Sequence, residues 1–159
     1  MAKRLNILLA GLEAGIIGGT AMLAWLAMVS LWHGRSVWSI PNLLASTFFG
    51  DDTLRRGFHL STLSGLSLHL LISTALGIAF SLATSRLGGR GRVLLLGIAS
   101  ALAWYFLGFA YLWRHINPLV LLYSPDIGML VAHVVFGVAI GMYPGHLASL
   151  QSQSDMGRR

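Results

Sequence analysis

The chain has 159 residues, of which 55% are hydrophobic and only 10% are charged, whereas soluble domains carry about 25% charged residues. A deficit this large indicates a chain that lies mostly in lipid, and the net charge of +6 then fits membrane topology and anionic lipid better than nucleic acid. The absence of cysteine excludes disulfides, thiolate metal sites and cysteine nucleophiles.

Four apolar runs are long enough to cross a bilayer as helices. They cover residues of about 7–32, 60–87, 93–113 and 125–143. The first run could be taken for a signal peptide, but it lacks a small-x-small cleavage site and is interrupted by Glu13, so we interpret it as an uncleaved span. The sequence therefore predicts an all-α fold, an integral membrane four-helix bundle that runs up-down-up-down in a single domain over residues 1–159.

The first span carries two unusual faces. Gly11, Gly15 and Gly19 form a double G-x-x-x-G strip, which lets two helices approach closely in lipid. Glu13 lies about 200° around the helix from Gly11, and a charge at the bilayer centre costs about 2.5–3.5 kcal/mol on insertion scales. Two explanations stay open: both faces are satisfied within this chain, or a second copy or another subunit covers them.

Residues 33–57 form the longest connection, and this connection is too apolar for a free loop. A Ser-x-Pro start and a Gly-Asp stop predict a short helix at about 38–49. We expect this helix to lie in the membrane interface, with Trp38, Phe48 and Phe49 in the headgroup region.

The second span carries a line of small or polar residues at i+4 spacing, which a helix places on one face. This line consists of Ser61, Gly65, His69, Ser73, Gly77, Ser81 and Ser85. The fourth span has a shorter line of the same kind, made of His133, Gly137, Gly141 and Gly145. Each line predicts a face that another helix backbone or a flat ligand can approach closely.

The two halves of the chain are weakly similar. The motif Leu-Ala-Trp occurs at residues 23–25 and again at 102–104, and His69 and His133 are each followed eight residues later by a glycine. Duplication of one helical hairpin and chance similarity of two apolar hairpins both stay open.

The cations predict how the spans are oriented. The side with both termini and the middle turn holds Lys3, Arg4, Arg86, Arg90, Arg92, Arg158 and Arg159. The other side holds Arg35, Arg55, Arg56 and Arg114. The positive-inside bias therefore predicts a multi-pass protein of a bacterial inner (plasma) membrane with both termini in the cytoplasm. A Ser-Pro-Asp start at residues 124–126 and a Pro-Gly stop at 144–145 are expected to bound the fourth span.

His69 and His133 are the best candidates for holding a cofactor. They lie on diagonal helices of the predicted bundle with glycines beside them, and two facing imidazoles suit a six-coordinate haem. In this arrangement the pair resembles the axial ligands of membrane b-type cytochromes, which implies a haem b between them. The alternative is that each histidine bonds a hydroxyl or a backbone carbonyl and that no cofactor binds. No His-x-x-x-His pair or carboxylate cluster predicts another metal site.

No nucleotide-binding loop, nucleophile triad, carboxylate pair or redox motif occurs, so we do not expect an enzyme. The first functional hypothesis is a small accessory subunit of a larger membrane complex, of respiratory or photosynthetic type, with other subunits or a second copy as partners and bound lipid around it. The second is a haem b or quinone-site subunit for electron transfer. The third is a small channel or transporter.

Overall fold

The structure is a computed structural model that describes residues 2–156, with side chains described for residues 4–125 and 127–152. All regular secondary structure in this range is helical, which confirms the all-α prediction. Each predicted apolar run corresponds to one helical run that is long and apolar enough to cross a membrane. These runs are Arg4–Trp32, Leu60–Thr84, Arg90–Ile116 and Ile127–Ser152.

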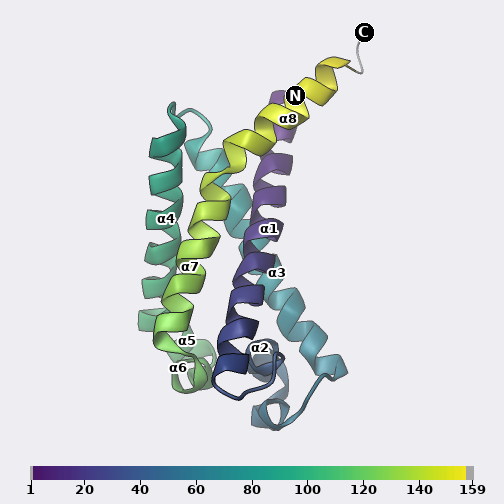
Figure 1. Ribbon diagram of the computed structural model, residues 1–159, viewed down its shortest axis with the longest axis vertical. Helices are drawn as coiled ribbons and strands as arrows, with labels where there is room; N and C mark the ends of the chain where they lie inside the picture. The colour runs from purple at the N-terminus through teal and green to yellow at the C-terminus, as the bar shows by residue number, and fades with distance from the viewer. Residues whose placement is uncertain (1, 157–159) are drawn as a thin grey trace.

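The long helices run between two ends of the molecule (Figure 1). α1 (Ala2–Trp32) starts at the end where both chain termini lie, which we call the terminal end, and runs to the far end. α3 (Leu60–Thr84) returns, α4 (Arg90–Leu107) runs to the far end again, and α7 (Asp126–Gly141) returns and continues into α8 (Tyr143–Met156). The short elements belong to the connections at the far end: α2 (Ser39–Phe49), η1 (Asp51–Arg55), η2 (Gly108–Leu112), α5 (Trp113–Ile116) and α6 (Pro118–Tyr123).

Glycine lets the two helices of each hairpin touch through backbone atoms. A Cβ atom on Gly77 of α3 would lie 2.7 Å from Cα of Gly15 in α1, and a Cβ atom on Gly97 of α4 would lie 2.8 Å from Cα of Gly141 in α7. No side chain fits into contacts this close, so α1–α3 and α4–α7 are two tightly packed pairs. Each pair consists of the two long helices from one half of the chain.

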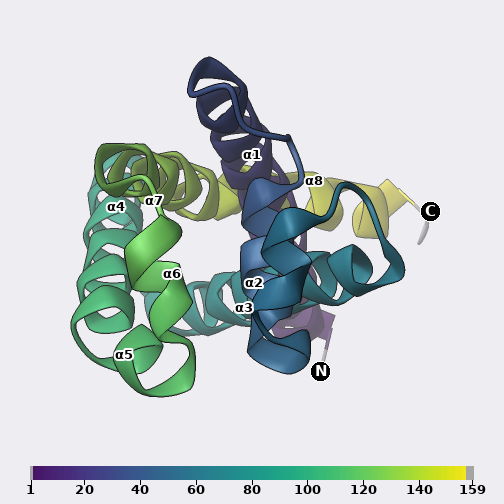
Figure 2. The ribbon, with the colours of Figure 1, turned by 90° about the horizontal axis from the view of Figure 1, so that it is seen from below.

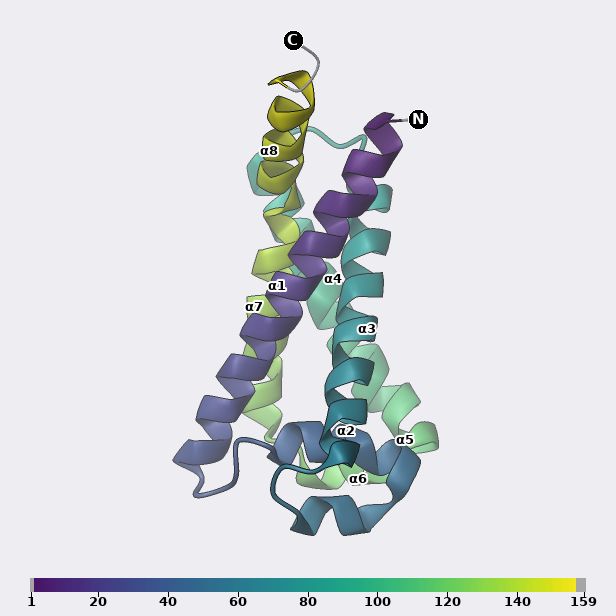
Figure 3. The ribbon, with the colours of Figure 1, turned by 90° about the vertical axis from the view of Figure 1, so that its right-hand side faces the viewer.

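α1 is the central helix of the arrangement. It packs against α3, α7 and α8, and α7 in turn packs against α4, whereas α3 and α4 meet only sparsely. Figure 3 shows α1 crossing between α7 and α3. The helices therefore follow the spatial order α3, α1, α7, α4, in which successive members are in extensive contact and the first and last meet only sparsely.

The short helix predicted after the first span is present, and Gly50 ends it with a positive φ of 75° that glycine adopts without strain. This helix, α2, does not lie freely on a surface, because its residues 40–46 are buried. A Cβ atom on Gly65 of α3 would collide with the carbonyl oxygen of Pro41, so α2 sits directly against α3. Figure 2 shows the far end, where α2 and α6 lie side by side across the long helices.

The predicted helix boundaries of the third and fourth spans differ in part from the structure. α7 ends at Gly141, close to the expected end of the fourth span, but the chain does not leave the helical path there, because a further helix, α8, begins at Tyr143 and places Pro144 in its first turn, where a missing N–H breaks no helical bond. Ser124 does not cap α7 through its side chain. The third run also extends beyond its predicted end, through the π turn of η2 and into α5.

Candidate functional site

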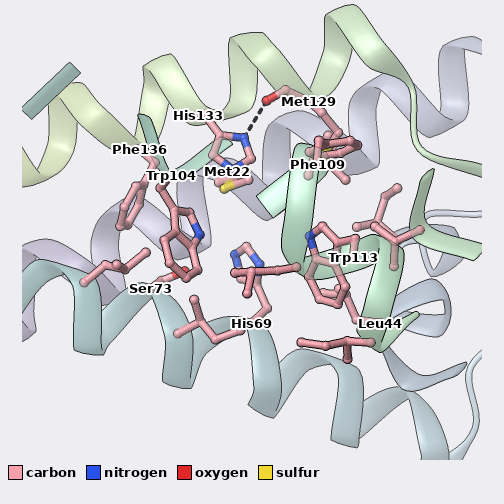
Figure 4. A pocket seen from close by; sticks show the side chains of 17 residues that line it. Met22, Leu44, His69, Ser73, Trp104, Phe109, Trp113, Met129, His133 and Phe136 are labelled. Atoms are coloured by element: carbon pink, nitrogen blue, oxygen red, sulfur yellow. Dashed lines mark hydrogen bonds between the residues drawn. The ribbon is translucent and has the colours of Figure 1, made fainter. Parts of the chain in front are cut away.

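A cavity of about 270 Å³ lies in the middle of the molecule between α1, α3 and α7. Residues of α2 and α6 close it toward the far end, and side chains from α4, η2 and α5 form the remaining wall (Figure 4). Most of the lining is aliphatic or aromatic, as in typical ligand pockets. The histidines among the lining residues are His69 and His133, which come from two helices that barely touch each other.

His69 is anchored to the neighbouring helix. Its side chain is buried, with 9% of its surface exposed, and its Nε2 atom lies 3.0 Å from the carbonyl oxygen of Gly19 in α1. A carbonyl oxygen only accepts hydrogen bonds, so Nε2 carries the hydrogen. In a neutral imidazole the other nitrogen, Nδ1, is then an acceptor.

His133 is anchored to its own helix. Its Nδ1 atom donates to the carbonyl oxygen of Met129, one turn earlier in α7, at 2.7 Å. Nε2 of His133 is therefore the acceptor nitrogen in a neutral ring. The ring of Tyr105 packs edge-on against the imidazole, with ring centroids 5.1 Å apart, and this contact adds to the fixed orientation.

The two histidines together give the cavity an unusual chemical character. Each ring donates its N–H to a backbone carbonyl. The second nitrogen of each ring is therefore an acceptor, and it has no hydrogen-bond donor among the described residues. A ligand that complements these atoms brings hydrogen-bond donors or a metal ion. The apolar wall around them requires the rest of that ligand to be apolar.

Aromatic side chains shape the cavity for a flat ring. Trp104 and Trp113 flank His69, and Phe109 lies near Met129 (Figure 4). The π turn of η2 contributes Phe109, and single π turns inside helices are frequent at functional sites. Ring faces on the walls favour a ligand that is itself an extended π system.

The cavity is only partly enclosed. The α1–α3, α1–α7 and α4–α7 contacts are extensive, and the cavity's far-end side is covered by α2 and α6. α3 and α4 both contribute lining residues, yet they meet only sparsely.

The glycines that the sequence assigns to helix packing are used within the chain. Gly11, Gly15 and Gly19 of α1 all face α3. Gly137 and Gly141 of α7 face α4, Gly77 faces α1, and Gly65 faces α2. The first explanation for the strip of α1 therefore holds, and the strip needs no second copy to cover it.

Glu13 also has its partner within the chain. One of its carboxylate oxygens lies 3.1 Å from Nδ1 of His146 on α8, and its side chain is 47% exposed. The continuation of α8 beyond the predicted stop is what brings His146 to this place. Glu13 does not line the cavity.

The three aromatic residues that the sequence places in the membrane interface have different environments at the far end. Trp38 packs against Phe58 with ring centroids 4.9 Å apart, while Phe48 and Phe49 are exposed. None of these residues lines the cavity.

Sequence reasoning missed the aromatic wall of the cavity. Trp104 and Trp113 stand in an apolar run in which aromatic residues are ordinary, so their number alone did not mark a site. Two sequence features could have marked Trp104 as a candidate site residue: it belongs to the repeated Leu-Ala-Trp motif, and the third span is aromatic only toward one end.

Among the described residues, no group of three or more histidine, cysteine, aspartate or glutamate side chains could hold a metal ion. Comparison of the chain with protein-family models, with curated proteins and with solved structures finds no significant match in any of the three.

Proposed function

We propose that this chain is a four-span membrane protein that binds a flat, lipid-soluble ring bearing hydroxyl groups, of the quinol class, between His69 and His133. The observation that carries the proposal is a pair of histidines that line an apolar, aromatic cavity and whose N–H groups are both bonded to backbone carbonyls, which leaves one acceptor nitrogen on each ring. A quinol brings two hydroxyl donors on opposite sides of one apolar ring. The oxidised quinone offers only carbonyl acceptors and complements the same nitrogens poorly.

The membrane location rests on helix length and on charge. Four helical runs are long and apolar enough to span a bilayer. Arg86, Arg90 and Arg92 lie in the connection between α3 and α4 or at the start of α4, at the terminal end (Figure 1). The positive-inside bias then orients both termini and this connection toward the cytoplasm of a bacterial inner membrane. In this orientation the cavity lies within the bilayer.

Single cysteines test the orientation, because the chain has no cysteine of its own. Cysteine at Asn6 or Gly89 is expected to resist a membrane-impermeant maleimide applied to intact cells, and cysteine at Gly57 is expected to react. Labelling at Gly89 in intact cells would reverse the orientation.

A quinol site suits a small accessory subunit of a larger respiratory or photosynthetic complex, which is the role that the sequence favours. The four long runs account for most of the described chain, so little of it is left to bind a soluble substrate. A channel has less support, because residues of α2 and α6 close the cavity at one end and its lining is mainly apolar.

Haem b is the second candidate ligand. His133 favours it, since an Nδ1–H bond to a carbonyl leaves Nε2 free, as in metal-bound histidines. His69 does not, because its Nε2 atom is already bonded to the carbonyl oxygen of Gly19. No arginine or lysine lines the cavity to pair with haem propionates. The geometry therefore fits a quinol better than a haem with two histidine ligands.

Tryptophan fluorescence provides the binding assay, because Trp104 and Trp113 line the cavity. Purified protein in mild detergent is titrated with decylubiquinol and, separately, with decylubiquinone. We expect saturable quenching and tighter binding of the quinol. His133→Ala should weaken quinol binding about tenfold, which corresponds to about 1.4 kcal/mol, the scale of one hydrogen bond.

His115→Ala is the matched control for this assay. His115 makes the same local bond as His133, from Nδ1 to the carbonyl oxygen of Tyr111 at 2.7 Å, but it is exposed and does not line the cavity. Equal quinol affinity in wild type, His69→Ala and His133→Ala would refute the proposal. A Soret band in the purified protein that disappears in both cavity variants would establish haem b instead.

A further inference from the structure

A second concavity, of about 520 Å³, lies at the far end and shares only Ile40 with the lining of the two-histidine cavity. It is formed by the connection before α2, the first turns of α2, the end of η1 with the two residues after it, and the last residue of α6. Three arginines surround it, namely Arg35, Arg55 and Arg56, while Ile40, Leu43 and Leu54 contribute apolar lining.

Tertiary contacts hold two of the three arginines, Arg35 and Arg56, at this concavity. Nη1 of Arg35 donates to the carbonyl oxygen of Tyr123 at 3.2 Å, which links the segment before α2 to the end of α6. The amide nitrogen of Asn42 donates to the carbonyl oxygens of Arg56 and Gly57, at 2.8 and 3.1 Å. These bonds involve the backbone of Arg56, so its guanidinium group is left for a ligand.

The concavity has a strong excess of positive charge. No acidic residue lines it, and within the described part of the chain none of the three arginines forms an ion pair with a carboxylate. Asp51 and Asp52 are the nearest acids in sequence, but they stand at the other end of η1 and outside the lining. A group of unpaired guanidinium ions around one hollow suits an anion, above all a phosphate.

Membrane topology does not account for these arginines. The positive-inside bias favours cations at the cytoplasmic end, and in the proposed orientation these three lie at the opposite end. Their apolar neighbours distinguish between two sources of phosphate. Ile40 and Leu43 are already buried, but Leu54 is only partly buried, so the glycerol and first methylene groups of a phospholipid gain from contact with Leu54, whereas a free phosphate ion gains nothing.

We propose that this concavity is a binding site for the phosphate headgroup of an anionic phospholipid in the leaflet at the far end. The three guanidinium groups bind the phosphate, and the apolar lining receives the glycerol and the start of the acyl chains. The proposal relies on the membrane location of the four long helices and is independent of any ligand between His69 and His133.

Delipidated protein in mild detergent is tested with phosphatidylglycerol, with phosphatidylcholine and with inorganic phosphate. Native mass spectrometry measures the retained lipid, and thermal unfolding measures stabilisation. We expect one retained phosphatidylglycerol, a higher unfolding midpoint with this lipid alone, and about tenfold weaker retention in Arg55→Gln/Arg56→Gln. Arg35→Gln, a change on the other side of the concavity, should also weaken retention.

Arg114→Gln is the matched control, because Arg114 is an exposed arginine of α5 that does not line the concavity. It should retain phosphatidylglycerol as the wild type does. Equal loss in Arg114→Gln, equal retention of phosphatidylcholine, or stabilisation by inorganic phosphate at the same concentration as the lipid would each overturn the lipid site. If the protein does not bind quinol but retains phosphatidylglycerol as described, only the proposed quinol site is refuted. The two proposals can therefore be refuted independently of each other.

Discussion

Replacing Gly77 with alanine adds one methyl group at the closest contact between α1 and α3. The new Cβ atom would lie 2.7 Å from Cα of Gly15 and 2.9 Å from its nitrogen, and closer still to the carbonyl oxygen of Gly11. All three neighbours are backbone atoms and cannot rotate away. The two helices must therefore separate, and separation also pulls the carbonyl oxygen of Gly19 away from His69.

The magnitude follows from two opposing terms. Overpacking costs about 1–3 kcal/mol, and the upper end applies where only backbone can yield. Alanine recovers about 1 kcal/mol of helix propensity relative to glycine. We therefore expect Gly77→Ala to lower the free energy of unfolding by about 2 kcal/mol.

Gly145→Ala is the control, because it makes the same chemical change in α8, where no atom lies within 4 Å of the new Cβ position. This variant should be neutral or more stable by up to about 1 kcal/mol. Unfolding by SDS in mixed micelles, followed by circular dichroism, gives the free energies. If both variants unfold at the same SDS fraction, the tight α1–α3 contact is not what holds these helices together.

Three further changes test other parts of the structure. Glu13→Gln should lower the unfolding free energy by less than about 1 kcal/mol, because its bond to His146 is half exposed; a larger loss in the SDS assay would mean that the pair is shielded from water. Asn42→Ala should cost about 2 kcal/mol, because the buried hydroxyl of Thr62 loses its acceptor and the carbonyl oxygen of Arg56 loses a donor, and wild-type stability would contradict that role. Gly15→Leu should unfold the chain without releasing a smaller particle in size-exclusion chromatography, because this glycine faces α3 of the same chain. A folded but smaller particle would show instead that Gly15 lies in an interface with a partner subunit, as the sequence led us to expect.

Local patterns in the sequence determined the helices. Apolar runs of bilayer length mark the four long helical runs, and the Gly-Asp stop places the end of α2 at Phe49, because glycine at position 50 takes a positive φ. The i+4 lines of small residues also identified faces that make close contacts, since helix periodicity alone puts such residues on one side. These features depend on neighbours in the chain and on nothing further away.

The partners of those faces were decided only by the tertiary structure. The strip of α1 could have met a second copy, and its use against α3 depends on how whole helices pack. Glu13 reaches His146 because α8 continues past Pro144, where the local signal predicts an end.

The same holds for both candidate sites. Which nitrogen of His69 is free depends on a carbonyl of Gly19, fifty positions away, and the arginines of the far-end concavity come from two separate segments of the chain. A sequence records residue types and spacings along one chain, whereas a site is set by distances between segments, and those distances are fixed only when the helices pack.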